Sequence, residues 1–124
     1  MTSARQMEQR SPAMREYLVS DLTEAQTSQI ENELKKRGWA ASLEHMFWLP
    51  LPECALSSVQ KSHCPKCAPY VAAVEVEPNC LRAELLVRSQ SSLHCECIAY
   101  AEPDQVAYIM NELHSILQGL NISC

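Results

Sequence analysis

Residues 70–100 read YVAAVEVEPNCLRAELLVRSQSSLHCECIAY, and this stretch decides the fold. Apolar and polar side chains alternate along it in three segments, 70–77, 81–88 and 93–100. Strict alternation places successive side chains on opposite faces of a strand. The pattern therefore predicts an antiparallel three-strand meander with one apolar face and one largely polar face.

Two turn signals separate these strands, Pro78-Asn79 and the serine-rich segment 89–92. A tight turn at Pro78-Asn79 predicts that Glu75 lies opposite Arg82 as a favourable cross-strand pair. At the other end of the meander, the same register aligns three residues: Tyr70, Val87 and Leu93.

Two amphipathic helices flank this region, at about 23–37 and 103–118. Thr23 and Gln26 form a capping box at the start of the first helix, and Gly38 ends it. Pro103 suits the first position of the second helix. The combination predicts an α+β fold, a two-layer sandwich of a mainly antiparallel sheet with both helices on one face.

Three shorter elements complete the predicted fold. The run 16–20 is a candidate first strand, and 40–49 is a candidate strand that Pro50 and Pro52 end. Residues 53–62 favour a short helix that leads into a pair of cysteines.

The chain has 124 residues, 47% of them hydrophobic, which suits one globular domain. We expect a disordered leader over 1–13 and a single domain over 14–124. The net charge of −5 argues against a nucleic-acid partner. Because no apolar run is long enough to span a bilayer and the first residues lack the apolar centre of a secretory signal, we expect a cytoplasmic protein with reduced thiols, bound to no membrane.

Four of the seven cysteines form two close pairs, Cys64-Pro65-Lys66-Cys67 and Cys95-Glu96-Cys97. Two pairs of thiols are the usual ligands of a tetrahedral zinc site. On a strand, Cys95 and Cys97 point to the same face, and the predicted register brings all four to one end of the sheet. The sequence thus predicts a metal site of Cys64, Cys67, Cys95 and Cys97, with zinc as the metal and iron as the alternative.

The first pair resembles the Cys-Pro-x-Cys half-site of zinc ribbons and rubredoxins, in which a loop turns around the ion. The resemblance covers four residues, and Ala68 stands where a glycine commonly follows. Next to the pairs, we interpret His63 as an exposed loop residue, while His94 points to the opposite face from Cys95. Cys80, near the predicted turn, lies at the other end of the meander.

Two other interpretations of the thiols remain open. Cysteine packs like a small hydrophobic residue, so Cys95 and Cys97 are also plausible core residues of a metal-free domain. A thiol redox protein or sensor that uses Cys64 and Cys67 is the other alternative. In redox proteins this motif begins a helix, whose dipole lowers a thiol pKa, whereas here a strand pattern follows.

The predicted function is that of a small binding or regulatory module with a structural zinc ion. A closed four-thiolate site has no open coordination position, so we expect a non-catalytic role. An unknown protein partner or self-association is the expected interaction, with Phe47 and Trp48 as a candidate surface, although core packing also explains these two aromatic residues.

Overall fold

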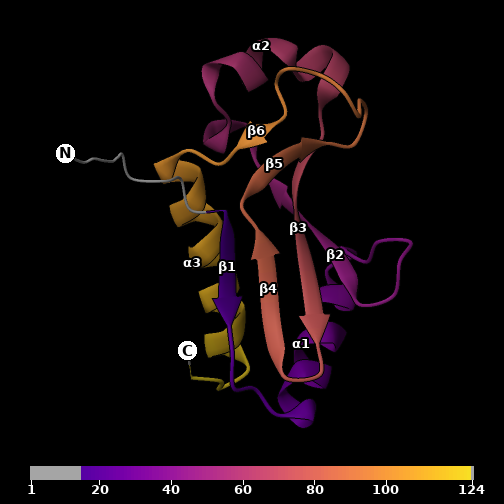
Figure 1. The fold of residues 1–124 in the computed structure, drawn as a ribbon, viewed down its shortest axis with the longest axis vertical. Coiled ribbons are helices and arrows are strands. Elements are labelled where there is room, and N and C mark those ends of the chain that lie inside the picture. Colours follow the sequence, from indigo (N-terminus) through magenta and orange to yellow (C-terminus); the bar gives the residue numbers. More distant parts are fainter. Residues whose placement is uncertain (1–14, 124) are drawn as a thin grey trace, which may run out of the picture.

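A computed structural model of the chain describes residues 15–123, and the predicted leader over 1–13 lies outside them. The fold is α+β, as predicted, with a mostly antiparallel sheet of six strands and three α-helices (Figure 1). In chain order the elements are β1 (Glu16–Val19), α1 (Glu24–Lys36), β2 (Met46–Leu51), a 3-10 turn (Glu53–Ala55), α2 (Ser58–Cys67), β3 (Tyr70–Glu77), β4 (Cys80–Glu84), β5 (Leu86–Ser89), β6 (Ala99–Tyr100) and α3 (Pro103–Gly119).

Strand β3 is the centre of the sheet. It pairs with β2 along one side and with β4 and β5, one after the other, along its other side. Beyond these, β1 pairs with β4 and β6 pairs with β5, all antiparallel. Strand β2 is therefore one edge of the sheet, and the short strands β1 and β6 form the other edge (Figure 1).

The β3–β4 hairpin has the predicted register, with Glu75 opposite Arg82. The ion pairs of Arg82, however, are formed with other carboxylates. The Arg82 guanidinium binds Glu16 at 2.7 Å and Glu77 at 3.1 Å instead. Glu77 is the diagonal neighbour across the hairpin, which long side chains reach as readily as the residue directly opposite.

The second predicted strand, 81–88, is interrupted at Leu85. The Leu85 N–H donates to the Arg15 carbonyl, and the Leu85 carbonyl accepts from Ala101 N–H, both at 2.9 Å. The interruption inserts two extra residues, so Tyr70 lies opposite Ser89 and the predicted alignment with Val87 is wrong. Since an even shift keeps the alternation, the predicted inward residues of both parts are still buried.

The third predicted strand, 93–100, is wrong for most of its length. Only Ala99–Tyr100 pairs with β5, and residues 90–98 form a loop. A hydrogen bond of 3.1 Å from Ile98 N–H to the Cys95 carbonyl closes a turn inside it. Cys95 and Cys97 therefore do not lie on a strand.

Strand β2 begins later than predicted and continues through Pro50. The Trp48 N–H points to the outer edge, where it donates to the Trp39 carbonyl at 2.7 Å. Pro50, two residues later, faces the same edge, so its missing N–H costs no hydrogen bond to β3. Phe47 is buried in the core, whereas Trp48 is half-buried on the opposite face.

Helices α1 and α3 both lie behind the sheet in Figure 1, so the other face of the sheet is open. Thr23 and Gln26 form the predicted capping box of α1, and Gly38 adopts the left-handed φ of 79° that ends it. The core between these helices and the sheet contains Ile30 and Leu34 of α1, Ile109, Leu113, Ile116 and Leu117 of α3, and the inward residues of β2 to β5.

Among residues 15–123, no helix combines the length and the apolar character that a bilayer crossing needs.

Candidate metal centre

Helix α2 supplies one half of the candidate site. Ser57 and Gln60 form a capping box at its start, and the helix continues to Cys67 through Pro65. Pro65 lacks the N–H that would donate to the Lys61 carbonyl, and its ring crowds that carbonyl, so it weakens the last turns of the helix. His63 and Cys67 are four residues apart, and this spacing places both side chains on one face of the helix.

The loop 90–98 supplies the other half, and hydrogen bonds from the end of β5 and the start of the loop attach it to the end of α2. Ser89 Oγ donates a short hydrogen bond to the Cys67 carbonyl, and Ser91 Oγ donates to the Ala68 carbonyl at 2.6 Å. The Gln90 N–H donates to the Pro69 carbonyl at 3.0 Å. The Cys67 carbonyl is one that the end of a helix leaves free, and the three bonds together hold the loop against the end of α2.

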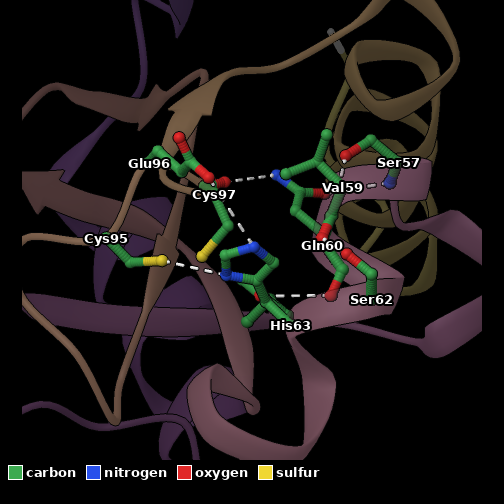
Figure 2. A network of polar contacts seen from close by, with 9 residues as sticks. Ser57, Val59, Gln60, Ser62, His63, Cys95, Glu96 and Cys97 are labelled. Carbon is green, nitrogen blue, oxygen red and sulfur yellow. Dashed lines mark hydrogen bonds and ion pairs between the residues drawn. The ribbon is translucent and has the colours of Figure 1, made fainter.

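Gln60 makes a second connection between α2 and the loop, deep in the protein. Its side chain is 2% exposed, and its Nε2 donates to the Cys97 carbonyl at 3.1 Å (Figure 2). Its Oε1 accepts from Ser57 N–H at 3.0 Å and from Gln105 Nε2 of α3 at 2.8 Å. Because every polar atom of this buried amide has a partner, the network fixes where Cys97 lies relative to α2.

The two halves bring together one imidazole nitrogen and three thiol sulfurs, which all lie within 4.8 Å of one another. The group consists of His63, Cys67, Cys95 and Cys97. Figure 2 shows the His63 ring pointing toward the sulfurs of Cys95 and Cys97. Tetrahedral zinc bonds of about 2.0 to 2.3 Å place ligand atoms roughly 3.5 to 3.8 Å apart, so small movements suffice to fit one ion.

Burial differs within the group. Cys67 and Cys97 belong to the core and are 3% and 1% exposed, while His63 and Cys95 are half-buried. An ion bound there would have protein on one side and would approach solvent on the side of His63.

Three of the four predicted ligands are therefore together, and Cys64 is outside the group. Successive side chains of a helix are rotated by about 100° around its axis. Cys64 therefore points about 100° away from His63, whereas Cys67, four residues after His63, lies on nearly the same face. The sequence interpretation placed residues 64–67 in a loop and treated His63 as an exposed loop residue. The spacing His-x3-Cys on a helix was the signal that could have identified His63.

The local environment separates the pKa values of Cys95 and Cys97. Hydrogen bonds from the backbone and then the side chain of Cys97 lower the pKa of the Cys95 thiol from 9.0 to about 7. Burial raises the pKa of Cys97 to about 11, although a hydrogen bond with the Tyr70 hydroxyl opposes this rise. Of these two thiols, Cys95 is therefore the one that ionises more readily in the metal-free protein.

His63 has a partner on each side of its ring. Nδ1 lies 3.0 Å from the Cys95 sulfur, and Nε2 lies 3.9 Å from a carboxylate oxygen of Glu96 (Figure 2). A metal-binding histidine commonly directs its second ring nitrogen to a carboxylate, which fixes the tautomer that coordinates the ion. The orientation of His63 fits coordination through Nδ1.

The Cys-Pro-Lys-Cys motif lies in the last part of α2, and β3 follows it from Tyr70, as expected. The end of a helix carries the negative pole of its dipole, which disfavours a thiolate. The low thiol pKa of redox motifs instead arises at the start of a helix. The position of Cys64 and Cys67 thus lacks the feature that activates such pairs.

Comparison with protein-family models, with curated proteins and with solved structures finds no match for this chain.

Proposed function

We propose that the chain is a small binding or regulatory domain in which His63, Cys67, Cys95 and Cys97 bind one structural zinc ion. The observation that carries the proposal is the convergence of these four donor atoms from α2 and the loop 90–98. Three cysteines and one histidine are a common donor set of structural zinc.

Zinc is the metal that this donor set favours. Thiolate and imidazole ligands in a tetrahedral arrangement suit zinc, and the same sulfur-rich set makes iron the second candidate. Four protein ligands fill the tetrahedron and leave no position for a substrate or a reactive water. The ion would therefore stabilise the domain rather than catalyse a reaction.

Zinc binding would contribute a large share of the stability of this part of the molecule. Structural zinc in small peptides binds with about 10 to 16 kcal/mol at neutral pH, which is comparable to the 5 to 15 kcal/mol stability of a whole domain. The ion would link α2 to the loop 90–98, which are otherwise joined by hydrogen bonds and the buried Gln60.

The second candidate function is thiol redox chemistry. The lowered pKa of Cys95 makes Cys95, rather than the pair Cys64 and Cys67, the reactive thiol of this alternative. A half-exposed thiolate next to two further thiols suits a redox sensor. The third interpretation, a metal-free domain, is supported by the burial of Cys67 and Cys97 within the core.

One experiment separates the three interpretations: elemental analysis of protein purified without added metal, combined with titration of reactive thiols. The proposal predicts one zinc per chain, with Cys67, Cys95 and Cys97 protected until a chelator is added. Protein without metal, in which Cys95 reacts rapidly, would favour the redox interpretation. Protein without metal and with slowly reacting thiols would favour the metal-free domain.

A matched pair of variants tests the ligand set. His63→Ala removes a proposed ligand and should lower zinc affinity strongly, whereas Cys64→Ser, one residue away on the same helix, should retain one zinc per chain. If His63→Ala retains zinc and Cys64→Ser loses it, the four-cysteine set predicted from the sequence is correct and the proposed set is not.

A further inference from the structure

The open face of the sheet carries two adjoining hollows that share Trp48 and Arg88. One hollow, of about 280 Å³, has apolar walls formed by Trp48, Val71, Leu93 and Ile98, and we call it the apolar hollow. The other, of about 320 Å³, is lined by three glutamates, and we call it the acidic hollow. This face is the one turned toward the viewer in Figure 1.

The wall of the apolar hollow includes a leucine that is largely exposed to solvent. Leu93 is 80% exposed, more than any other large hydrophobic residue among the described ones. An exposed leucine beside a half-buried tryptophan leaves apolar surface uncovered, and such surface often marks an interaction site. Covering Leu93 together with Trp48 would remove this surface from water.

The acidic hollow has an excess of negative charge. Glu16, Glu75 and Glu84 line it together with two arginines. Arg82 is bound to Glu16 and Glu77, and Arg88 to Glu84, so Glu75 has no ion-pair partner within residues 15–123.

A basic side chain from a partner would therefore pair with Glu75, because both arginines of the acidic hollow are bound to other glutamates. Glu75 offers a carboxylate and Trp48, which lines the same hollow, offers an aromatic face, and both attract a lysine or an arginine. The net charge of −5 of the chain acts in the same direction over a longer range.

The apolar hollow is connected to the candidate metal centre through the chain. Leu93 and Ile98 belong to the loop 90–98, which also carries Cys95 and Cys97. Holding the two cysteines on one ion would fix the loop and, with it, two of the four apolar walls.

We infer that the open face docks a segment of a partner protein that presents an apolar side chain next to a basic one. The apolar side chain fills the apolar hollow against Leu93 and Trp48, and the basic side chain binds Glu75 in the acidic hollow. A further part of the inference, that zinc maintains the apolar hollow, rests on the proposed function.

The test is an NMR titration of ¹⁵N-labelled, zinc-loaded protein with synthetic peptides. Each peptide contains one leucine and one arginine separated by one to five Gly or Ser residues, and matched controls replace the arginine by glutamate or the leucine by glycine. We expect at least one spacing to shift the Trp48 indole, Glu75 and Leu93 signals, and both controls to bind at least tenfold more weakly. If no spacing shifts these signals at peptide concentrations up to about 1 mM, the docking inference is wrong.

Two pairs of exposed variants locate the binding. Leu93→Ser and Glu75→Gln should each weaken the best peptide about tenfold, whereas Leu43→Ser and Glu44→Gln, in the exposed turn before β2, should not change its affinity. Equal affinity of all four variants would overturn the inference. A protein dimer that Leu93→Ser dissociates would also overturn it, because the face would then bind a second copy.

The metal part has a separate outcome. Zinc removal should weaken the best peptide at least tenfold while leaving the folded core intact. If zinc is bound but its removal does not change peptide affinity, the coupling is wrong although the zinc site stands. If the protein binds the peptide and contains no metal, the docking inference stands and the proposed function fails.

Discussion

The hairpin end of the sheet, around Pro78 and Asn79, and the thiol end, formed by α2 and the loop 90–98, differ in what holds them together. At the hairpin end the side chains that meet are aliphatic and fully buried, among them Val76, Leu81 and Ile30. At the thiol end, the buried residues of α2 (Ser58–Cys67) are Gln60 and Cys67 alone.

This difference indicates where the stability of each end originates. Burial of large aliphatic side chains stabilises the hairpin end without any ligand. The thiol end has hydrogen bonds, which contribute about 1 kcal/mol each, and the buried thiols of Cys67 and Cys97, and the proposed zinc ion would add to these. We therefore expect metal removal to loosen one end and leave the other folded.

Metal removal should have the largest effect. At zinc concentrations about 1,000-fold above the dissociation constant, binding stabilises the folded state by about 4 kcal/mol, which a chelator should remove. Hydrogen exchange measured by mass spectrometry should accelerate in 58–67 and 90–98 and stay slow in 74–83. Cys64→Ser protein is the control and should respond as the original chain does. Unchanged exchange at the thiol end would contradict the difference between the two ends.

Leu81→Ala should destabilise the hairpin end by about 3 kcal/mol, because Leu81 is 1% exposed and its removal leaves a cavity. Denaturant unfolding should give the same loss with zinc and with chelator, because the site lies at the other end. A loss that appears only without zinc would mean that the two ends are not independent.

Gln60→Met should cost about 1 to 3 kcal/mol, since it removes the partners of the Cys97 carbonyl and the Ser57 N–H while conserving volume. Gln118→Met, on the exposed side of α3, is the matched control and should change unfolding by less than about 0.5 kcal/mol. Zinc affinity should also fall in the Gln60 variant, because the loop loses its buried anchor.

The smallest effect is a pH dependence of the metal-free protein. The pKa of Cys95 is lowered to about 7, so its thiolate favours the folded state above the ordinary pKa of 9.0, and this stabilisation is lost as pH falls through 7. Burial raises the pKa of Cys80 at the hairpin end, which acts in the opposite direction and only above pH 9. Alkylation followed by peptide mass spectrometry should therefore modify Cys95 from about pH 7 and Cys80 only at higher pH. Equal alkylation of both thiols at pH 7 would contradict the assigned environments.

Much of the hairpin end was predictable from the sequence because its signals are local. The alternation along β3 and β4, the turn at Pro78 and the capping box at Thr23 each depend on neighbouring residues, and the structure confirms all three. The break at Leu85 was not predictable, because its backbone groups pair with Arg15 and Ala101, which are distant in sequence.

The thiol end was predicted less well, because the alternation of apolar and polar residues over 93–100 arises from a strand only at Ala99–Tyr100. The alternation over 93–100 resembles a strand, but Leu93 faces solvent and the cysteines are positioned by a turn and by contacts with α2. The convergence of Cys67, Cys95 and Cys97 was nevertheless correct, since it required only that both segments reach the same end of β3. His63 was missed because residues 64–67 were interpreted as a loop around the ion, whereas α2 continues to Cys67 and places both residues on one helix face.

X-ray absorption spectroscopy at the zinc edge, on protein purified without added metal, tests the central claim most directly. The account predicts a four-coordinate ion with three sulfur ligands at about 2.3 Å and one nitrogen ligand at about 2.0 Å. Four sulfur ligands would place Cys64 in the site instead of His63, and protein that contains no metal would contradict the site itself.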